Sequence, residues 1–147
     1  MKRPKHRIIP KAQLRNELKP LFERHEEVKI AYLYGSYALE RQNEFSDIDI
    51  GIVIEPKIEP NPLYFAKIAS EIEQIFDYTV EADVRVLNNV PPRFLFKVIN
   101  QGILIYCSDE TFKNEVELNA IRRYVDIKPL LAFFDNAYLD EVFQDEN

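Results

Sequence analysis

The sequence predicts an α/β domain that ends in a helical tail. Two observations predict this class. Four short apolar or alternating segments, typical of strands, alternate with segments of helical periodicity, and one long helical region follows the last strand. The chain has 147 residues, which is the usual size of one domain, so we expect a single domain over residues 1–147.

The first half of the chain predicts two helices and two strands. "KAQLRNELKPLFERHE" has leucines at helical spacing, and Pro20 is expected to kink or divide this helix. Residues 28–34, "VKIAYLY", are β-branched and aromatic, which is typical of a buried strand that Gly35 then ends. Ser36 is expected to cap a short helix in "SYALERQ". Residues 46–55 alternate and then become apolar, so they predict a second strand.

The second half predicts the remaining elements. A proline-rich loop is followed by a helix over residues 62–76, with Asn61 as its cap. Residues 80–88 alternate as a third strand. "PPRFLFKVINQG" predicts a short helix, and "ILIYC" predicts a fourth strand. Ser108 is then expected to cap the helical tail, which covers about residues 108–140.

Composition limits the functions to be considered. The net charge is −6, and because nucleic-acid-binding domains are more often basic, no direct nucleic-acid binding is expected. The single cysteine, Cys107, fits a reducing compartment. No apolar run approaches the ~20 residues of a membrane span, and no signal-peptide pattern opens the chain. We therefore expect a cytoplasmic protein without a membrane partner.

The charge is unevenly distributed along the chain. Residues 1–19 carry seven Lys or Arg against one acid, and residues 135–147 carry five acids and no Lys or Arg. These segments are either two solvated ends or a surface through which one end docks on a charged partner.

Three carboxylates are expected to meet on one face of the sheet if the second and third strands are neighbours. Asp47 and Asp49 alternate with isoleucines, so both point to one face while the isoleucines point to the core. Asp83 lies on the polar face of its own strand. Adjacent carboxylates resist ionising together without a cation, and such hard oxygen ligands suit Mg²⁺. The three residues therefore predict a two-metal site for in-line phosphoryl or nucleotidyl transfer.

A Gly-Ser pair precedes these aspartates by ten residues. Gly35 has no side chain and lets a phosphate approach closely, and a helix beginning at Ser36 would present free N–H groups to it. Arg41, in the connection to the next strand, is a further candidate for contacting a phosphate. A Gly-Ser pair alone is usually only a turn, and Asp-x-Asp alone is usually a solvated strand end. Their combination in a strand–turn–helix–strand context favours nucleotide binding.

At "YGSYALERQNEFSDIDIGIVIE" the sequence resembles the polymerase-β-like nucleotidyltransferase superfamily, and its spacing and small size are similar to the minimal, MNT-type branch. "EADVRVLNNVPPRFLFKVINQGILIY" supports the resemblance. The resemblance implies a small mixed sheet with flanking helices over a core of about residues 26–106. "AIRRYVDIKPLLAFF" is similar to the helical end of these proteins.

The resemblance also implies an activity. MNT-type proteins are antitoxins that are paired with a HEPN-domain RNase toxin, and they transfer AMP from ATP to a tyrosine of the toxin. By this resemblance Gly35 and Ser36 hold the β- and γ-phosphates of ATP, while Asp47 and Asp49 bind two Mg²⁺ ions. Asp83 completes the metal site and acts as a general base, and pyrophosphate leaves.

Several alternatives stay open. The chain has no second domain to form a deep acceptor pocket, which favours a protein acceptor over a small molecule. Neutralisation by binding alone, through the apolar tail and the charged ends, is one alternative, and nucleotidyl transfer to a small molecule is another. The tail is also compatible with self-association. The sequence fixes neither the preferred nucleotide, nor the modified tyrosine, nor the number of AMP units.

Five other residues have predictions of their own. Tyr34 and Tyr37 flank the Gly-Ser turn and are candidates for contacting the nucleotide. Arg85 shares the face of Asp83 and is expected to pair with either a carboxylate or a phosphate. His6 and His25 are far from the motif in sequence and are not expected to take part in the chemistry.

Overall fold

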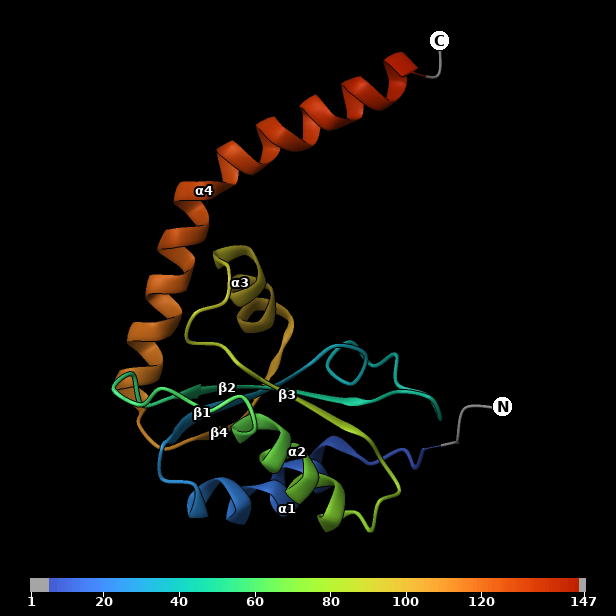
Figure 1. Ribbon diagram of the computed structural model, residues 1–147, viewed down its shortest axis with the longest axis vertical. Helices are drawn as coiled ribbons and strands as arrows, with labels where there is room; N and C mark the ends of the chain where they lie inside the picture. Colours follow the sequence, from blue (N-terminus) through green and yellow to red (C-terminus); the bar gives the residue numbers. More distant parts are fainter. Residues whose placement is uncertain (1–5, 146–147) are drawn as a thin grey trace.

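The computed structural model describes residues 6–145 of the chain, with side chains described for residues 6–137 (Figure 1). Its elements, in chain order, are α1 (Lys11–Arg24), β1 (Val28–Tyr34), β2 (Ile48–Ile54), α2 (Tyr64–Ile75), β3 (Ala82–Val86), α3 (Pro92–Gln101), β4 (Ile103–Cys107) and α4 (Glu110–Asp145). This alternation confirms the predicted α/β class with a helical tail.

In the described part of the chain, four strands form one mixed sheet in the order β3-β2-β1-β4. β1 pairs antiparallel with both β2 and β4, whereas β2 and β3 are parallel. A parallel pair cannot be joined by a tight hairpin, and the crossover that it requires contains α2. The second and third strands are therefore neighbours, which is the condition under which the three carboxylates were expected to meet.

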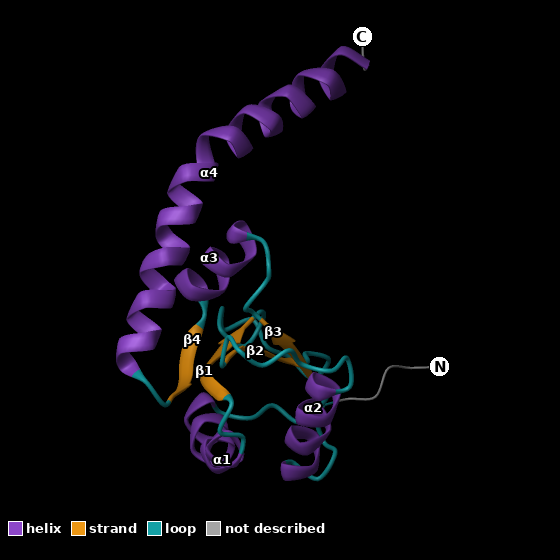
Figure 2. Ribbon diagram, turned by 60° about the vertical axis from the view of Figure 1, so that its left-hand side comes forward, coloured by secondary structure: helices purple, strands orange, loops and turns teal. Residues whose placement is uncertain are grey.

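Helices cover both faces of this sheet (Figure 2). Side chains of α1 and α2 pack with alternate residues of β2 in one core cluster, and α3 and the first part of α4 contribute to a second cluster on the opposite face. On β2, Ile48, Ile50 and Ile52 are fully buried in the first cluster. Because side chains alternate along a strand, Asp49 and Gly51 face the side of α3 and α4.

Most of the predicted elements are confirmed with small shifts of their ends. α2 begins two residues later than predicted, because Asn61 forms a turn in which its Oδ1 accepts the N–H of Leu63 at 2.8 Å. Pro20 lies inside α1 and does not divide it. Buried leucines on both sides of Pro20 hold the helix against the sheet, and this packing outweighs the lost hydrogen bond.

The predicted short helix after Gly35 is wrong. Residues 35–40 form a run of turns instead. Gly35 has a φ of 70° and Glu40 has a φ of 55°, so left-handed residues stand at both ends of the run. A right-handed helix cannot pass through such residues, which leaves too few positions between them for a helix.

The cap of α4 also differs from the prediction. Oδ1 of Asp109 accepts the N–H of Phe112 at 3.0 Å, which is the hydrogen bond of a helix N-cap. The hydroxyl of Ser108 instead lies 3.4 Å from the carbonyl oxygen of Lys29, and so ties the end of β4 to the start of β1. The expected helical tail therefore begins one residue later, with a different capping side chain.

The first part of α4 packs on the rest of the fold. The hydroxyl of Tyr32 donates a 2.7 Å hydrogen bond to Glu117, and the rings of Phe96 and Tyr124 stack at 4.0 Å. α4 then bends in its middle, near Pro129, and extends away from the sheet (Figure 1). Several large apolar side chains of this helix are exposed: Leu118, Ile121, Val125, Leu130, Phe133 and Phe134.

Two features from the sequence are only partly covered by the structure. Lys2, Arg3 and Lys5 of the basic end lie outside the described residues, as do the acidic side chains beyond residue 137. Among the helices of residues 6–145, none combines the length and the apolar character needed to cross a membrane. The division of a single domain into a core and a tail stays a prediction.

A hydrogen-bonded network fixes α1 and α2 to the start of β1. His25 follows α1, and its Nε2 lies 2.6 Å from Glu71 of α2 while its Nδ1 lies 3.3 Å from Glu27. The hydroxyl of Tyr64 donates a 2.5 Å hydrogen bond to Glu27. Burial alone would raise the pKa of Glu27, but the hydrogen bond from Tyr64 and the neighbouring His25 outweigh it, and the pKa lies below its ordinary value.

The variant Tyr64→Phe tests this network. Losing a hydrogen bond to a carboxylate is expected to lower the free energy of unfolding by about 1–2 kcal/mol at pH 7. A carboxylate with a lowered pKa stabilises the fold above its unfolded-state pKa, and this stability is lost as the pH falls through the folded-state pKa. The difference in unfolding free energy between the wild type and Tyr64→Phe should therefore become smaller as the pH falls below 4.5, the ordinary pKa of a glutamate.

Urea unfolding at pH 7 and pH 4 measures this difference. Tyr78→Phe is the matched control, because the Tyr78 side chain is 69% exposed and Glu27 has no hydrogen bond from it. An effect of equal size at both pH values would contradict the assignment to Glu27.

Candidate active site

The structure brings the three predicted carboxylates together at one end of the sheet. The parallel register places Asp49 of β2 directly opposite Asp83 of β3, and the antiparallel register places Tyr34 of β1 opposite Asp49 on its other side. Asp47 immediately precedes β2 and is near enough for its charge to act on Asp49. The strand alternation that buries the isoleucines of β2 thus presents these carboxylates on the α3 side of the sheet.

Asp49 is the carboxylate whose ionisation is most affected. Half-burial, followed by the charges of Asp83 and Asp47, raises the pKa of Asp49 to about 6, while the opposing charge of Arg85 lowers it. Burial and like charges both disfavour the ionised form. A cation bound among these groups would remove that cost, so the site favours a positively charged ligand.

Gly35 lies directly against the carboxylate of Asp49. It follows β1 with a φ of 70°, and a Cβ at this position would overlap Oδ2 of Asp49. Both the left-handed backbone and the lack of space require glycine here. The sharp turn therefore brings a bare backbone segment to the edge of the carboxylate cluster.

Ser36 and Arg41 belong to the same turn. The carbonyl of Ser36 accepts the N–H of Arg41 at 2.8 Å, which closes the turn. Ser36 is partly buried, whereas the side chain of Arg41 is exposed. Ser36 thus lies next to Gly35 in the turn. Arg41 contacts the turn through its backbone N–H.

Arg85 pairs with a carboxylate in this structure. Its Nε lies 3.6 Å from Oδ2 of Asp83, and its guanidinium lies 5.6 Å from the ring centroid of Phe94. Tyr34 meets Phe94 edge to face at 5.7 Å, and burial raises the pKa of Tyr34 to about 12. Phe94 was not identified from the sequence, because its spacing fits a core position of α3. Tyr37 is fully buried in the core and so does not reach the site.

His6 is the residue that the sequence interpretation missed. Its ring Nδ1 lies 3.8 Å from Oδ1 of Asp47 and 3.1 Å from the carbonyl oxygen of Ser46, forty positions away in the chain. Its Nε2 lies 3.7 Å from Oε1 of Glu81. No periodic pattern in the sequence links the segment before α1 to these loops, so only the fold reveals this contact.

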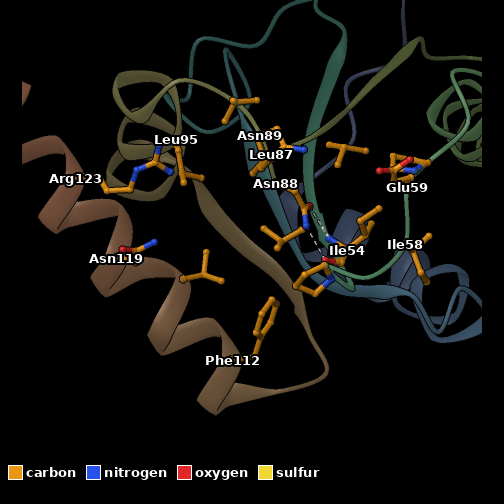
Figure 3. Close-up of a pocket in the computed structure, with 16 residues that line it drawn as sticks. Ile54, Ile58, Glu59, Leu87, Asn88, Asn89, Leu95, Phe112, Asn119 and Arg123 are labelled. Carbon is orange, nitrogen blue, oxygen red and sulfur yellow. Dashed lines mark hydrogen bonds between the residues drawn. The ribbon is translucent and has the colours of Figure 1, made fainter.

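Two cavities lie on the same sheet face as the carboxylates. A cleft of about 160 Å³ opens beside Gly35, between Tyr34, Phe94 and Lys97. A larger pocket of about 540 Å³ lies between the loops after β2 and β3 and the start of α4 (Figure 3). Val53 and Leu87 line this pocket, four residues beyond Asp49 and Asp83 along their strands. The large pocket is therefore at the far end of β2 and β3 from the carboxylates.

The donor set of the site suits a divalent cation. Three carboxylates share one small region, and burial together with the charges of Asp83 and Asp47 raises the pKa of Asp49. Hard oxygen ligands of this kind fit Mg²⁺, which keeps its other positions for water or phosphate. The bare turn at Gly35 leaves room beside them for such a phosphate.

Known proteins resemble this chain in sequence. Residues 16–111 match the family model described as polymerase beta, nucleotidyltransferase. A protein of Methanocaldococcus jannaschii whose provisional name is protein adenylyltransferase is 29% identical over 91 residues. That match covers 62% of this chain and 92% of the relative.

Solved structures resemble the fold as a whole. A chain in the crystal structure of a toxin–antitoxin pair with AMP-PNP has a TM-score of 0.66 at 21% identity, over 87% of this chain and 98% of that chain. A chain in the complex of tri-AMPylated Shewanella oneidensis HEPN toxin with MNT antitoxin has a TM-score of 0.64 at 18% identity, over 88% and 96% of the two chains. At these identities the likeness shows the fold alone.

The variant Gly35→Ala tests the close approach to Asp49. A Cβ on a left-handed backbone, placed against a carboxylate, is expected to lower the free energy of unfolding by about 1–3 kcal/mol. Thermal and urea unfolding measure the loss. Ser36→Ala is the matched control, because it changes the next residue of the turn without adding an atom. Equal stability of the glycine variant and the wild type would show that the turn does not need its present geometry.

Proposed function

Because the chain belongs to the polymerase beta nucleotidyltransferase family, we propose that it is a Mg²⁺-dependent protein adenylyltransferase of the cytoplasm. Its proposed substrates are ATP and a tyrosine of a HEPN-domain toxin, so that it acts as the antitoxin of that toxin. One observation carries the proposal: Asp49 lies opposite Asp83 and against the bare turn at Gly35, inside the segment that matches the family.

Each site residue has a proposed role. Gly35 and Ser36 bind the β- and γ-phosphates of ATP, and Arg41 is a further phosphate contact from the same turn. Asp47, Asp49 and Asp83 hold the divalent cations. The chemistry that a cation supplies when bound is neutralisation of charge on the phosphate oxygens. The raised pKa of Asp49 and the space beside Gly35 support these roles.

The proposed reaction is an in-line displacement at the α-phosphorus of ATP. The tyrosine oxygen forms a bond to this phosphorus, and the bond to the pyrophosphate oxygen breaks. Asp83, whose side chain is half exposed, accepts the proton of the tyrosine hydroxyl as general base. Arg85 lies beside Asp83 and is placed to offset negative charge as pyrophosphate leaves.

The partner assignment rests on the relatives and on α4. Structures that share this fold contain toxin–antitoxin pairs, and one of them holds an AMPylated HEPN toxin. The projecting part of α4 exposes Leu130, Phe133 and Phe134, which is an apolar surface of the kind that a partner protein covers. A protein acceptor also agrees with an open site, since the described residues contain no second domain to enclose a small acceptor.

Neutralisation by binding alone is the second candidate, and the same exposed side chains of α4 favour it. In this case the complex, and not AMP transfer, inactivates the toxin. A variant that cannot transfer AMP but still neutralises the toxin fully in cells would establish this candidate. Transfer of AMP to a small molecule in the absence of any partner protein would favour a different acceptor.

The double variant Asp47→Asn, Asp49→Asn tests catalysis. It keeps the size of both side chains and removes two proposed cation ligands, so AMP transfer should fall by at least about 100-fold. Intact-mass spectrometry of the HEPN-domain protein, after incubation with ATP and Mg²⁺, measures the transfer. Glu26→Gln is the control, because it removes an exposed carboxylate at the opposite end of β1. Transfer at the wild-type rate by the double variant would overturn the assignment.

The double variant Phe133→Ser, Phe134→Ser tests the partner surface. Both side chains are exposed, so the fold should stay intact while the affinity for the HEPN-domain protein falls at least about 10-fold. Isothermal titration calorimetry measures the affinity. Leu63→Ser is the matched control, because Leu63 is 73% exposed and precedes α2 on another part of the molecule. Unchanged affinity would place the interface elsewhere.

A further inference from the structure

The segment before α1 is fastened to the loops that precede β2 and β3. The N–H of His6 donates a 2.5 Å hydrogen bond to the carbonyl of Glu44, and the N–H of Arg7 donates to the carbonyl of Thr79 at 2.9 Å. The N–H of Ile9 donates to the hydroxyl of Tyr37 at 3.3 Å. These bonds hold the imidazole of His6 under the loop that carries Asp47.

The imidazole of His6 is buried and only half satisfied. Its side chain is 5% exposed, and its Nδ1 lies 3.1 Å from the carbonyl oxygen of Ser46. A carbonyl can only accept, so the neutral ring carries its proton on Nδ1 and leaves a lone pair on Nε2. This Nε2 is buried and has no hydrogen-bond partner. A buried acceptor without a partner is unfavourable, so a ligand bound to Nε2 would stabilise this arrangement.

Two carboxylates lie beside the imidazole ring, one near each nitrogen. Oε1 of Glu81 lies 3.7 Å from Nε2, and Oδ1 of Asp47 lies 3.8 Å from Nδ1. One donor atom from each of the three residues lies within 4.8 Å of the others. Ligand atoms about 2.1 Å from a tetrahedral zinc ion are about 3.4 Å apart, so small side-chain movements bring all three into coordination distance.

The other histidine of the chain shows how the same residue types behave without an ion. His25 also lies between two glutamates, but its Nε2 is 2.6 Å from Glu71 and its Nδ1 is 3.3 Å from Glu27. Both of its nitrogens therefore meet a carboxylate directly. The buried Nε2 of His6, which has no hydrogen-bond partner, distinguishes His6 from His25.

We propose that His6, Asp47 and Glu81 form a cation site for a transition-metal ion of the zinc class, with water in the fourth position. Zinc accepts imidazole nitrogen together with carboxylate oxygen ligands, whereas Mg²⁺ prefers oxygen ligands alone. The hydrogen bond from Nδ1–H to a backbone carbonyl is the outer contact that orients a ligating histidine. This zinc site does not depend on which molecule accepts AMP in the proposed reaction.

The site would join three separate segments of the chain. His6 precedes α1, Asp47 precedes β2, and Glu81 precedes β3. Because a carboxylate has two oxygens, Asp47 can coordinate this ion through one and keep the other for the proposed nucleotide site. A bound ion would fix the position of Asp47 relative to Asp49, so this is a positioning site and not a second catalytic centre.

Zinc binding to the full chain tests the proposal. The protein, freed of metal with a chelator, is titrated with zinc alone against a chromophoric zinc chelator. We expect one equivalent to bind, and His6→Gln and Glu81→Gln should each weaken this binding at least about 10-fold. His25→Gln is the matched control and should bind zinc as the wild type does. Asp49→Asn should also keep the zinc equivalent, because it changes only the neighbouring carboxylate cluster.

Cobalt as a spectroscopic probe reports on the nitrogen ligand. The visible absorption of the cobalt-loaded wild type should change in His6→Gln and stay unchanged in His25→Gln. Far-UV circular dichroism checks the fold of each variant. If His6→Gln does not fold, the zinc affinity of Glu81→Gln tests the proposal instead. The Glu81 side chain is 57% exposed, so this substitution leaves the core intact.

Three results would overturn the proposal. The first is that the wild type binds no zinc, in which case His6, Asp47 and Glu81 do not form a metal site. His6→Gln and Glu81→Gln bind zinc with wild-type affinity, which places the ion elsewhere. Asp49→Asn abolishes zinc binding while His6→Gln retains it, which assigns the ion to the cluster of Asp49 and Asp83.

Discussion

The register between β2 and β3 is the constraint on which the rest of the site depends. Ile48, Ile50 and Ile52 must all enter the core beneath α1 and α2, and this fixes which side chains of β2 face the other way. A slip of one residue would expose the isoleucines and bury Asp49. The hydrophobic core on one face of the sheet therefore sets the positions of the charged groups on the other.

Much of this arrangement is readable from the sequence because it is periodic. Alternation identified the strands, and it correctly put Asp49 and Asp83 on the same face once the strands proved to be neighbours. What the sequence could not give depends on non-periodic contacts. The turn after β1 is not a helix, because two left-handed residues interrupt it, and Asp109 takes the capping role expected of Ser108. His6 reaches Asp47 only because the folded chain returns there.

The two histidines illustrate how the fold separates stability from ligand binding. The network of His25 is satisfied by protein groups, and it joins α1 and α2 to the sheet on the face that holds the main core. Asp49 and His6 differ from this network, because the pKa of Asp49 is raised and Nε2 of His6 is buried without a hydrogen-bond partner. Such unfavourable arrangements persist where the surrounding structure holds them, and they are concentrated where a ligand can relieve them.

The order of the elements along the chain has a consequence for how the protein is made. Gly35, Asp47 and Asp49 are synthesised with the antiparallel pair of β1 and β2, but Asp83 arrives only after the crossover through α2. All of the proposed carboxylates are thus synthesised before α3 and α4, the helices that cover their face of the sheet. The cover of the site is therefore the last part of the domain to be made.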